Sequence, residues 1–260
     1  MASWQRKLIW MSAALITFFL TIVVFLPAAW LSALLEKQTG GRLSLGDVQG
    51  SFWSGSAFVG VAADNNGPVT PVFPGRFSWK ISPLLLLGQI EVNLSNPEAL
   101  SKPVLMTGNV STLFVSEAVL LLPTERLQGL GAPLNTIGPS GKLDMHWKNL
   151  SFVREGTQFN GQGQLLFTLS DMSSRLSPVR PLGSYEVRLD LQGTKMNLQL
   201  QTQQGPMMLS GTGGIQGGRL QFSGKAWAQD GAEAKLANLL NLLGQRRKEG
   251  AKDVIALEFK

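Results

Sequence analysis

The feature that most constrains this chain is a stretch without charged residues near the N-terminus, from Leu8 to Leu26. A helix of about 20 residues crosses the hydrocarbon core of a bilayer, which is about 30 Å thick. The stretch also exceeds the apolar region of an ordinary cleaved signal peptide, which has about 7 to 15 residues. We predict a retained transmembrane anchor over residues 8–30, with Trp30 at headgroup level. The alternative is cleavage near Pro27.

The charges on the two sides of this stretch predict its orientation. Arg6 and Lys7 lie immediately before it, and the first charge after it is Glu36. Positive charges favour the cytoplasmic side of a membrane span. Residues 1–7 then form a cytoplasmic basic tail, and residues 31–260 are exported.

The composition of the exported part limits its partners and its chemistry. Its length is sufficient to bury a core, as one large domain or two smaller ones. The chain has 23 basic and 17 acidic residues, and without the two basic residues of the tail the net charge is 21 − 17 = +4. This excess is too small and too dispersed for a nucleic-acid interface, so we expect no nucleic-acid partner. The absence of cysteine excludes disulfides and thiolate metal sites.

Short segments in which apolar and polar residues alternate dominate the exported part. The clearest are 77–81, 90–94, 143–147, 165–169, 185–191 and 196–201. Alternation places one face of a strand on a core and the other in water. Glycine and proline separate the segments, and 48–60 has the pattern of a hairpin. We predict a mainly β fold with a large antiparallel sheet, sandwich or groove, and a few short helices.

Three other segments of the exported part are less regular. Leucines share one helical face between Ala232 and Leu243, and Gly244 is typical of a helix stop, so we predict a helix there. Residues 113–122 are apolar on too many sides to assign. The segment 123–140 contains several glycines and prolines and is the best candidate for an internal boundary.

The sequence contains no recognisable catalytic or metal-binding group of residues. His146 is the only histidine, and strand parity places it on a polar face with Asp144 and Lys148. A common zinc site needs more imidazole or thiolate ligands than one histidine supplies. Neither a phosphate-binding loop nor a nucleophile elbow is present. We therefore expect no enzymatic activity, no cofactor and no metal.

Several stretches, taken in order, resemble a known family. They are the basic N-terminus, the span that ends in Leu-Pro-Ala-Ala-Trp, and the segments 48–57, 77–84, 86–90, 182–185, 205–211 and 239–244. Together they resemble the N component of the bacterial type II secretion system. Each motif is short, so their order carries the resemblance, which covers nearly the whole chain.

The resemblance implies a single-pass protein of the bacterial inner membrane with a cytoplasmic N-terminus and a periplasmic β-rich domain. It implies an accessory role in the export of folded proteins across the outer membrane, with other secretion components of the inner-membrane platform as partners. The family is similar in architecture to grooved β proteins of the AsmA type, some of which handle lipid. It contributes no catalytic residues.

Two mechanisms follow for such a protein. In the first, exposed strand edges and loops bind the periplasmic domains of other secretion components. In the second, the apolar faces leave a groove for an acyl chain, lined by Trp53, Trp79, Trp147 and Phe167. The alternative for these four residues is an ordinary closed core.

Overall fold

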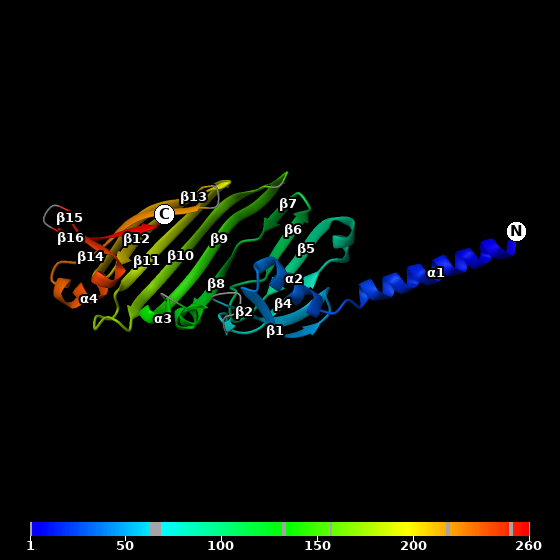
Figure 1. Cartoon of the computed structure of the whole chain (residues 1–260), viewed down its shortest axis with the longest axis horizontal. Helices are drawn as coiled ribbons and strands as arrows, with labels where there is room; N and C mark the ends of the chain where they lie inside the picture. The colour runs from blue at the N-terminus through cyan, green and yellow to red at the C-terminus, as the bar shows by residue number, and fades with distance from the viewer. Residues whose placement is uncertain are drawn as a thin grey trace.

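The computed structural model of the chain describes residues 2–62, 69–131, 134–156, 158–216, 219–249 and 252–259. A long N-terminal helix stands away from a body that is built mostly of strands (Figure 1). Within the described residues, sixteen strands form one antiparallel sheet. The predicted mainly β fold, with a large antiparallel sheet and a few short helices, is therefore confirmed.

The elements have the following bounds. The helices are α1 (Ala2–Val24), α2 (Ala29–Thr39), α3 (Leu134–Ile137) and α4 (Glu233–Leu243), with the 3-10 helices η1 (Pro83–Leu87) and η2 (Thr124–Leu130). The strands are β1 (Leu43–Gly50), β2 (Ser54–Val61), β3 (Thr70–Pro71), β4 (Phe77–Ile81), β5 (Gln89–Ser95), β6 (Val104–Asn109), β7 (Thr112–Val115), β8 (Ala118–Pro123), β9 (Pro139–Glu155), β10 (Gln158–Ser174), β11 (Gly183–Gly193), β12 (Lys195–Gln204), β13 (Met207–Gln216), β14 (Arg219–Ala228), β15 (Gln245–Glu249) and β16 (Lys252–Phe259). Their order in the sheet is β1-β2-β4-β5-β6-β7-β9-β10-β11-β12-β13-β14-β16-β15, with β3 beside β2 and β8 beside β9.

Helix α1 is long and apolar enough to cross a membrane over Trp4–Val24, and none of the residues in this range is buried. It ends at Val24, whereas the sequence predicted an anchor that extends to residue 30. Trp30 lies in the first turn of α2 instead. The long helix and the body are at opposite ends of an elongated molecule (Figure 1).

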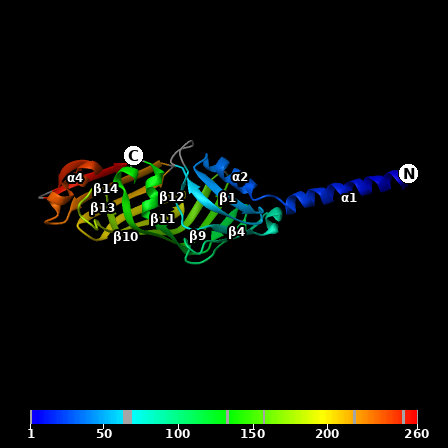
Figure 2. The same ribbon diagram turned by 90° about the horizontal axis from the view of Figure 1, so that it is seen from below.

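The predicted strands are confirmed: each alternating segment lies inside one strand of the sheet. The predicted hairpin at 48–60 corresponds to β1 and β2, which pair from Leu43 opposite Val61 to Gly50 opposite Gly55. In the half of the body away from α1, β9 to β14 lie side by side, and α4 lies at the far end (Figures 1 and 2).

The sheet continues across the segment 123–140. Strands β7 and β8 precede this segment, and both pair with β9, which follows it. The segment itself forms η2 and α3, and its residues 132–133 lie outside the described part of the chain. Residues 113–122, which the sequence left unassigned, form β7 and β8. Leu120 is buried while Leu121 is exposed, so an apolar residue on each face obscures the alternation.

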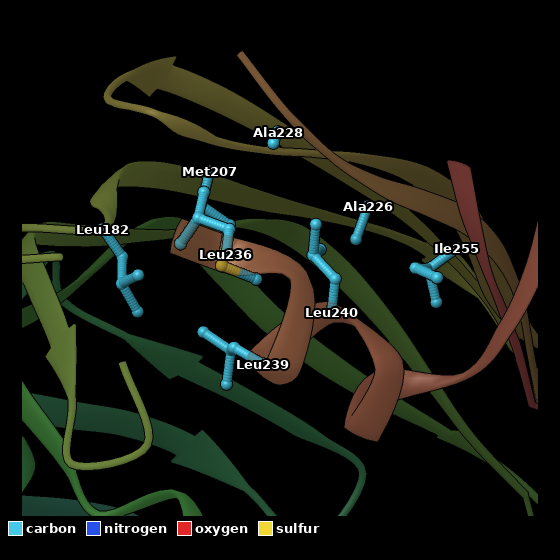
Figure 3. Packing of buried hydrophobic residues seen from close by; sticks show 8 residues of the cluster. All are labelled: Leu182, Met207, Ala226, Ala228, Leu236, Leu239, Leu240 and Ile255. Atoms are coloured by element: carbon cyan, nitrogen blue, oxygen red, sulfur yellow. The ribbon is translucent and has the colours of Figure 1, made fainter. Parts of the chain in front are cut away.

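The predicted C-terminal helix is α4, which covers one end of the long strands. Leu236, Leu239 and Leu240 of this helix are buried among residues of neighbouring strands (Figure 3). Those partners include Met207 on β13 and Ile255 on β16. Burial of these leucines is what holds α4, because a helix of 11 residues is marginal in water on its own.

Candidate functional site

The chain contacts the β1–β2 hairpin almost immediately after α1, before α2 begins. Only Phe25 and Leu26 separate the helix from an isolated antiparallel bridge between Pro27 and Ser51. The backbone N–H of Phe52 donates to the carbonyl oxygen of Leu26 at 2.8 Å. The β1–β2 hairpin therefore holds the chain directly where it leaves the helix.

Trp53 joins α1 to the same hairpin. Its indole N–H donates to the carbonyl oxygen of Val23 at 2.7 Å, and its ring packs edge-on against Phe52 with centroids 5.2 Å apart. Its own carbonyl oxygen accepts from the backbone N–H of Ile81 at 2.7 Å. This predicted groove residue thus contacts the last turn of the candidate membrane span.

The residues predicted for the anchor fall in three places. Arg6, Lys7 and Leu8 lie in α1, near its N-terminal end. Leu26 follows the helix and belongs to the junction with the hairpin. Trp30 is exposed on α2, close to that junction. The basic residues and the sheet therefore flank the apolar part of α1 at its two ends.

One face of the sheet is apolar from β8 to β12, and we call it the apolar face. Residues directly opposite each other on antiparallel strands lie on the same face. The first row of such residues is Ala118, Trp147, Leu165, Leu189 and Leu198. The second row is Leu120, Met145, Phe167, Val187 and Leu200. The opposite face of β11 and β12 is polar and carries Glu186, Arg188, Gln199 and Gln201.

The apolar face is covered at its edges and half open in its middle. On β8 and β9, Ala118, Leu120 and Trp147 are buried. The residues of both rows on β10 to β12 are all half-buried: Leu165, Phe167, Val187, Leu189, Leu198 and Leu200. Helix α4 packs on β14 and β16, to one side of them. A closed sandwich would bury these residues under a second layer, so β10–β12 present an apolar surface that remains accessible to water.

The other three predicted groove residues differ in their surroundings. Trp79 is buried against Ala28 and Ala57, and its indole N–H donates to the carbonyl oxygen of Phe52 at 3.0 Å. Trp147 is buried as well, and its indole N–H donates to a backbone carbonyl oxygen at 2.7 Å. Both rings belong to buried clusters, and Trp79 also lines a cleft of about 450 Å³ whose other lining residues are mostly polar or glycine. Phe167 lies on the half-buried part of the apolar face.

On β13 and β14 the apolar face continues over glycines, against which the ring of Phe222 packs. Leu200 is opposite Gly211, and Gly211 is opposite Gly224. A Cβ atom would lie 2.4 Å from the ring of Phe222 at Gly211 and 2.8 Å from it at Gly224. The ring of Phe222 therefore occupies the space that side chains would fill. Sequence analysis missed this packing of a ring on glycines, for which the signal in the sequence is that Gly211 and Gly213 are two residues apart and therefore lie on one face of the strand.

The described residues show no arrangement that supports catalysis. Within them, no three histidine, cysteine or acidic residues gather closely enough to hold a metal ion. His146 is half-buried between Val119 and Leu166, on the same face as Asp144. The sequence reasoning placed it on that face but expected a more exposed ring.

A second surface lies at the far end of the sheet, where β15 is the last strand. A cleft of about 660 Å³ separates α4 from β15 and β16. Its lining combines apolar, acidic and basic side chains, namely Ala228, Asp230, Glu233, Ala234, Ala237, Leu240, Arg246, Lys248, Asp253 and Ile255. Arg246 lies 3.5 Å from Asp253, and Arg247 lies 2.9 Å from Glu258. The outer strand of the sheet thus carries three consecutive basic residues beside a cleft of mixed polarity.

Comparisons with known proteins identify the family. The family model for protein N of the type II secretion system matches residues 41–254. This range begins after α1 and α2 and contains nearly all of the sheet. Comparisons with curated proteins and with solved structures give no match. The resemblance predicted from short motifs is confirmed by a match over most of the chain, and the protein belongs to the type II secretion system protein N family.

Proposed function

We propose that this protein is an accessory inner-membrane component of the type II secretion system, which acts through periplasmic contacts with other components during export of folded proteins. The observation that carries the proposal is the family match over residues 41–254. Membership of this family implies interaction with other secretion components, and the family is a secretion accessory family that is not known for enzymatic activity. The sheet is therefore a binding surface in this proposal.

The proposed location rests on α1 and its flanking charges. Among the residues that the structure describes, one apolar helix could span a membrane, which is consistent with a single-pass protein. Arg6 and Lys7 at its start favour a cytoplasmic N-terminus, which would leave the sheet in the periplasm. In this proposal α1 crosses the inner membrane, as the resemblance to the family implies.

The edge of the sheet at β15 is the contact surface that the structure favours. An end strand has backbone groups free to pair with a strand of another protein, and its basic side chains favour an acidic partner. Lys248 is exposed there and also lines the cleft beside α4. At the opposite end, α2 packs on β1 and reduces access to that strand.

Co-purification tests this proposal. The tagged full chain is extracted in mild detergent from cells that make the secretion components, and bound components are quantified. We expect a platform component in a fixed ratio to the wild-type chain and at least severalfold less with Lys248→Glu. The matched control is Lys195→Glu, which changes another exposed lysine, at the β11–β12 turn. Absence of secretion components from the wild-type sample would refute the proposal, and equal losses from both variants would refute the role of β15.

A second candidate function is binding of lipid on the apolar face. The observation that favours it is the set of half-buried apolar side chains on β10 to β12. Native mass spectrometry of the full chain should then find lipid in a fixed ratio. Leu198→Glu should abolish that signal, whereas Gln199→Glu, the next residue on the opposite face, should leave it unchanged. Lipid-free wild-type protein would exclude this function.

A further inference from the structure

The loop between β4 and β5 presents three neighbouring leucines to solvent. They belong to η1, and their exposed fractions are 42% for Leu84, 63% for Leu86 and 78% for Leu87. The run of four leucines is far too short to cross a bilayer, so sequence reasoning gave it no role. Several adjacent exposed leucines in one loop form the kind of apolar patch that marks a binding surface.

This loop is a well-defined turn. The hydroxyl oxygen of Ser82 accepts from the backbone N–H of Leu84 at 3.3 Å at its start. At its end Gly88 has φ of 80°, which favours glycine, and its N–H donates back to the carbonyl oxygens of Leu84 and Leu85. Leu85 is half-buried, so the turn is fixed on the body while the other leucines point outward. The patch is therefore held in a fixed shape.

Two hydrogen bonds place the loop beside the end of α1. The indole N–H of Trp53 donates to Val23 in the last turn of α1, and the carbonyl oxygen of Trp53 accepts from Ile81. Ile81 is the last residue of β4, and η1 begins two residues later. The cyan-green loop that joins β4 to β5 lies at the end of the body from which α1 leaves (Figures 1 and 2).

We propose that η1 is a second membrane contact, in which Leu84, Leu86 and Leu87 enter the outer boundary of the bilayer that α1 spans. This inference rests on the anchoring of α1 that the proposed function includes. A span that ends at Val24 brings the end of the body to the headgroup layer, and η1 is the part of that end with an exposed apolar surface. Leucine side chains favour the boundary between headgroups and acyl chains, where they leave water.

The absence of cysteine from the chain allows a direct test of depth in the membrane. Single variants Leu87→Cys, Leu242→Cys and Phe25→Cys are each labelled with an environment-sensitive fluorophore and reconstituted as full chains in phospholipid vesicles. Leu242 is the matched control, because it is 68% exposed on α4 at the far end of the body. Phe25, 74% exposed just after α1, reports the anchor itself. Quenching by spin-labelled lipid is then compared among the three positions.

We expect lipid quenching of the label at positions 25 and 87 to be at least threefold stronger than at position 242. Adding Leu84→Ser and Leu86→Ser should reduce the quenching at position 87 and leave that at position 25 unchanged. Quenching at position 25 alone would overturn the loop contact and leave the anchor intact. Quenching at neither position would overturn both. A blue-shifted label at position 87 without lipid quenching would mean that protein covers the loop, which also overturns the proposal.

Discussion

The replacement of Leu236 by alanine tests the packing that holds α4 on the sheet. Leu236 is fully buried, with an exposed fraction of 0%, and it belongs to the same cluster as Met207 and Ala226. Replacing a buried leucine by alanine lowers the free energy of unfolding by about 2 to 5 kcal/mol, because apolar burial is lost and a cavity remains. Alanine is the best helix former, so the change does not weaken α4 itself. Because Leu236 is enclosed on all sides, we expect a loss of about 3 kcal/mol in the free energy of unfolding.

Urea unfolding of the full chain in mild detergent, followed by tryptophan fluorescence, measures this loss. Trp227 on β14 lies on a strand that α4 contacts and is a suitable reporter. The matched control is Leu242→Ala on the same helix, where the side chain is mostly exposed, and we expect a cost below about 0.5 kcal/mol. Equal effects of the two substitutions would show that α4 does not pack on the sheet through the face described here.

Three further predictions concern other parts of the sheet. Burial raises the pKa of the Tyr185 phenol above its value of about 10 in the unfolded chain. Its contribution to the free energy of unfolding is therefore complete below pH of about 10 and decreases as the pH rises further. The stability of Tyr185→Phe should depend less on pH in this alkaline range. Gly211→Val should lower the free energy of unfolding by about 1 to 3 kcal/mol in urea, because the new side chain meets the ring of Phe222, and an unchanged stability would contradict the packing of that ring on Gly211. Trp53→Phe removes the hydrogen bond to Val23, worth about 0.5 to 1.5 kcal/mol; hydrogen exchange should become faster at the end of α1 and stay unchanged in α4.

The strands could be predicted from the sequence because alternation depends only on neighbouring residues. The segment 185–191 alternates cleanly, and it forms β11 with an apolar and a polar face. Alternation cannot reveal which elements pack on the apolar face, because those elements are distant in the sequence. Trp147 and Phe167 therefore have the same pattern in sequence, although one ring is buried and the other half-buried.

The end of the membrane helix illustrates the same limit. Hydropathy does not separate an apolar residue in lipid from one in a protein core. Ala28 continues the apolar stretch in the sequence but is buried against Ala57 and Trp79 of the sheet. The hydrogen bonds of Trp53, which lies some thirty residues later, fix the position of the junction. No local pattern around Pro27 contains this information.

The contact between the end of α1 and the β1–β2 hairpin has a consequence for how the protein meets its partners. A flexible linker would let the body take up many orientations and many distances from the bilayer. Here Phe25 and Leu26 are the only residues between the helix and the bridge at Pro27, and hydrogen bonds from Phe52 and Trp53 hold the two sides of the junction together. We therefore expect the body to follow the tilt and rotation of the helix. A small tilt of the helix in the membrane would therefore produce its largest displacement at β15, at the end of the body farthest from α1 (Figure 1). Other proteins in the same membrane would meet β15 at a defined distance from the bilayer.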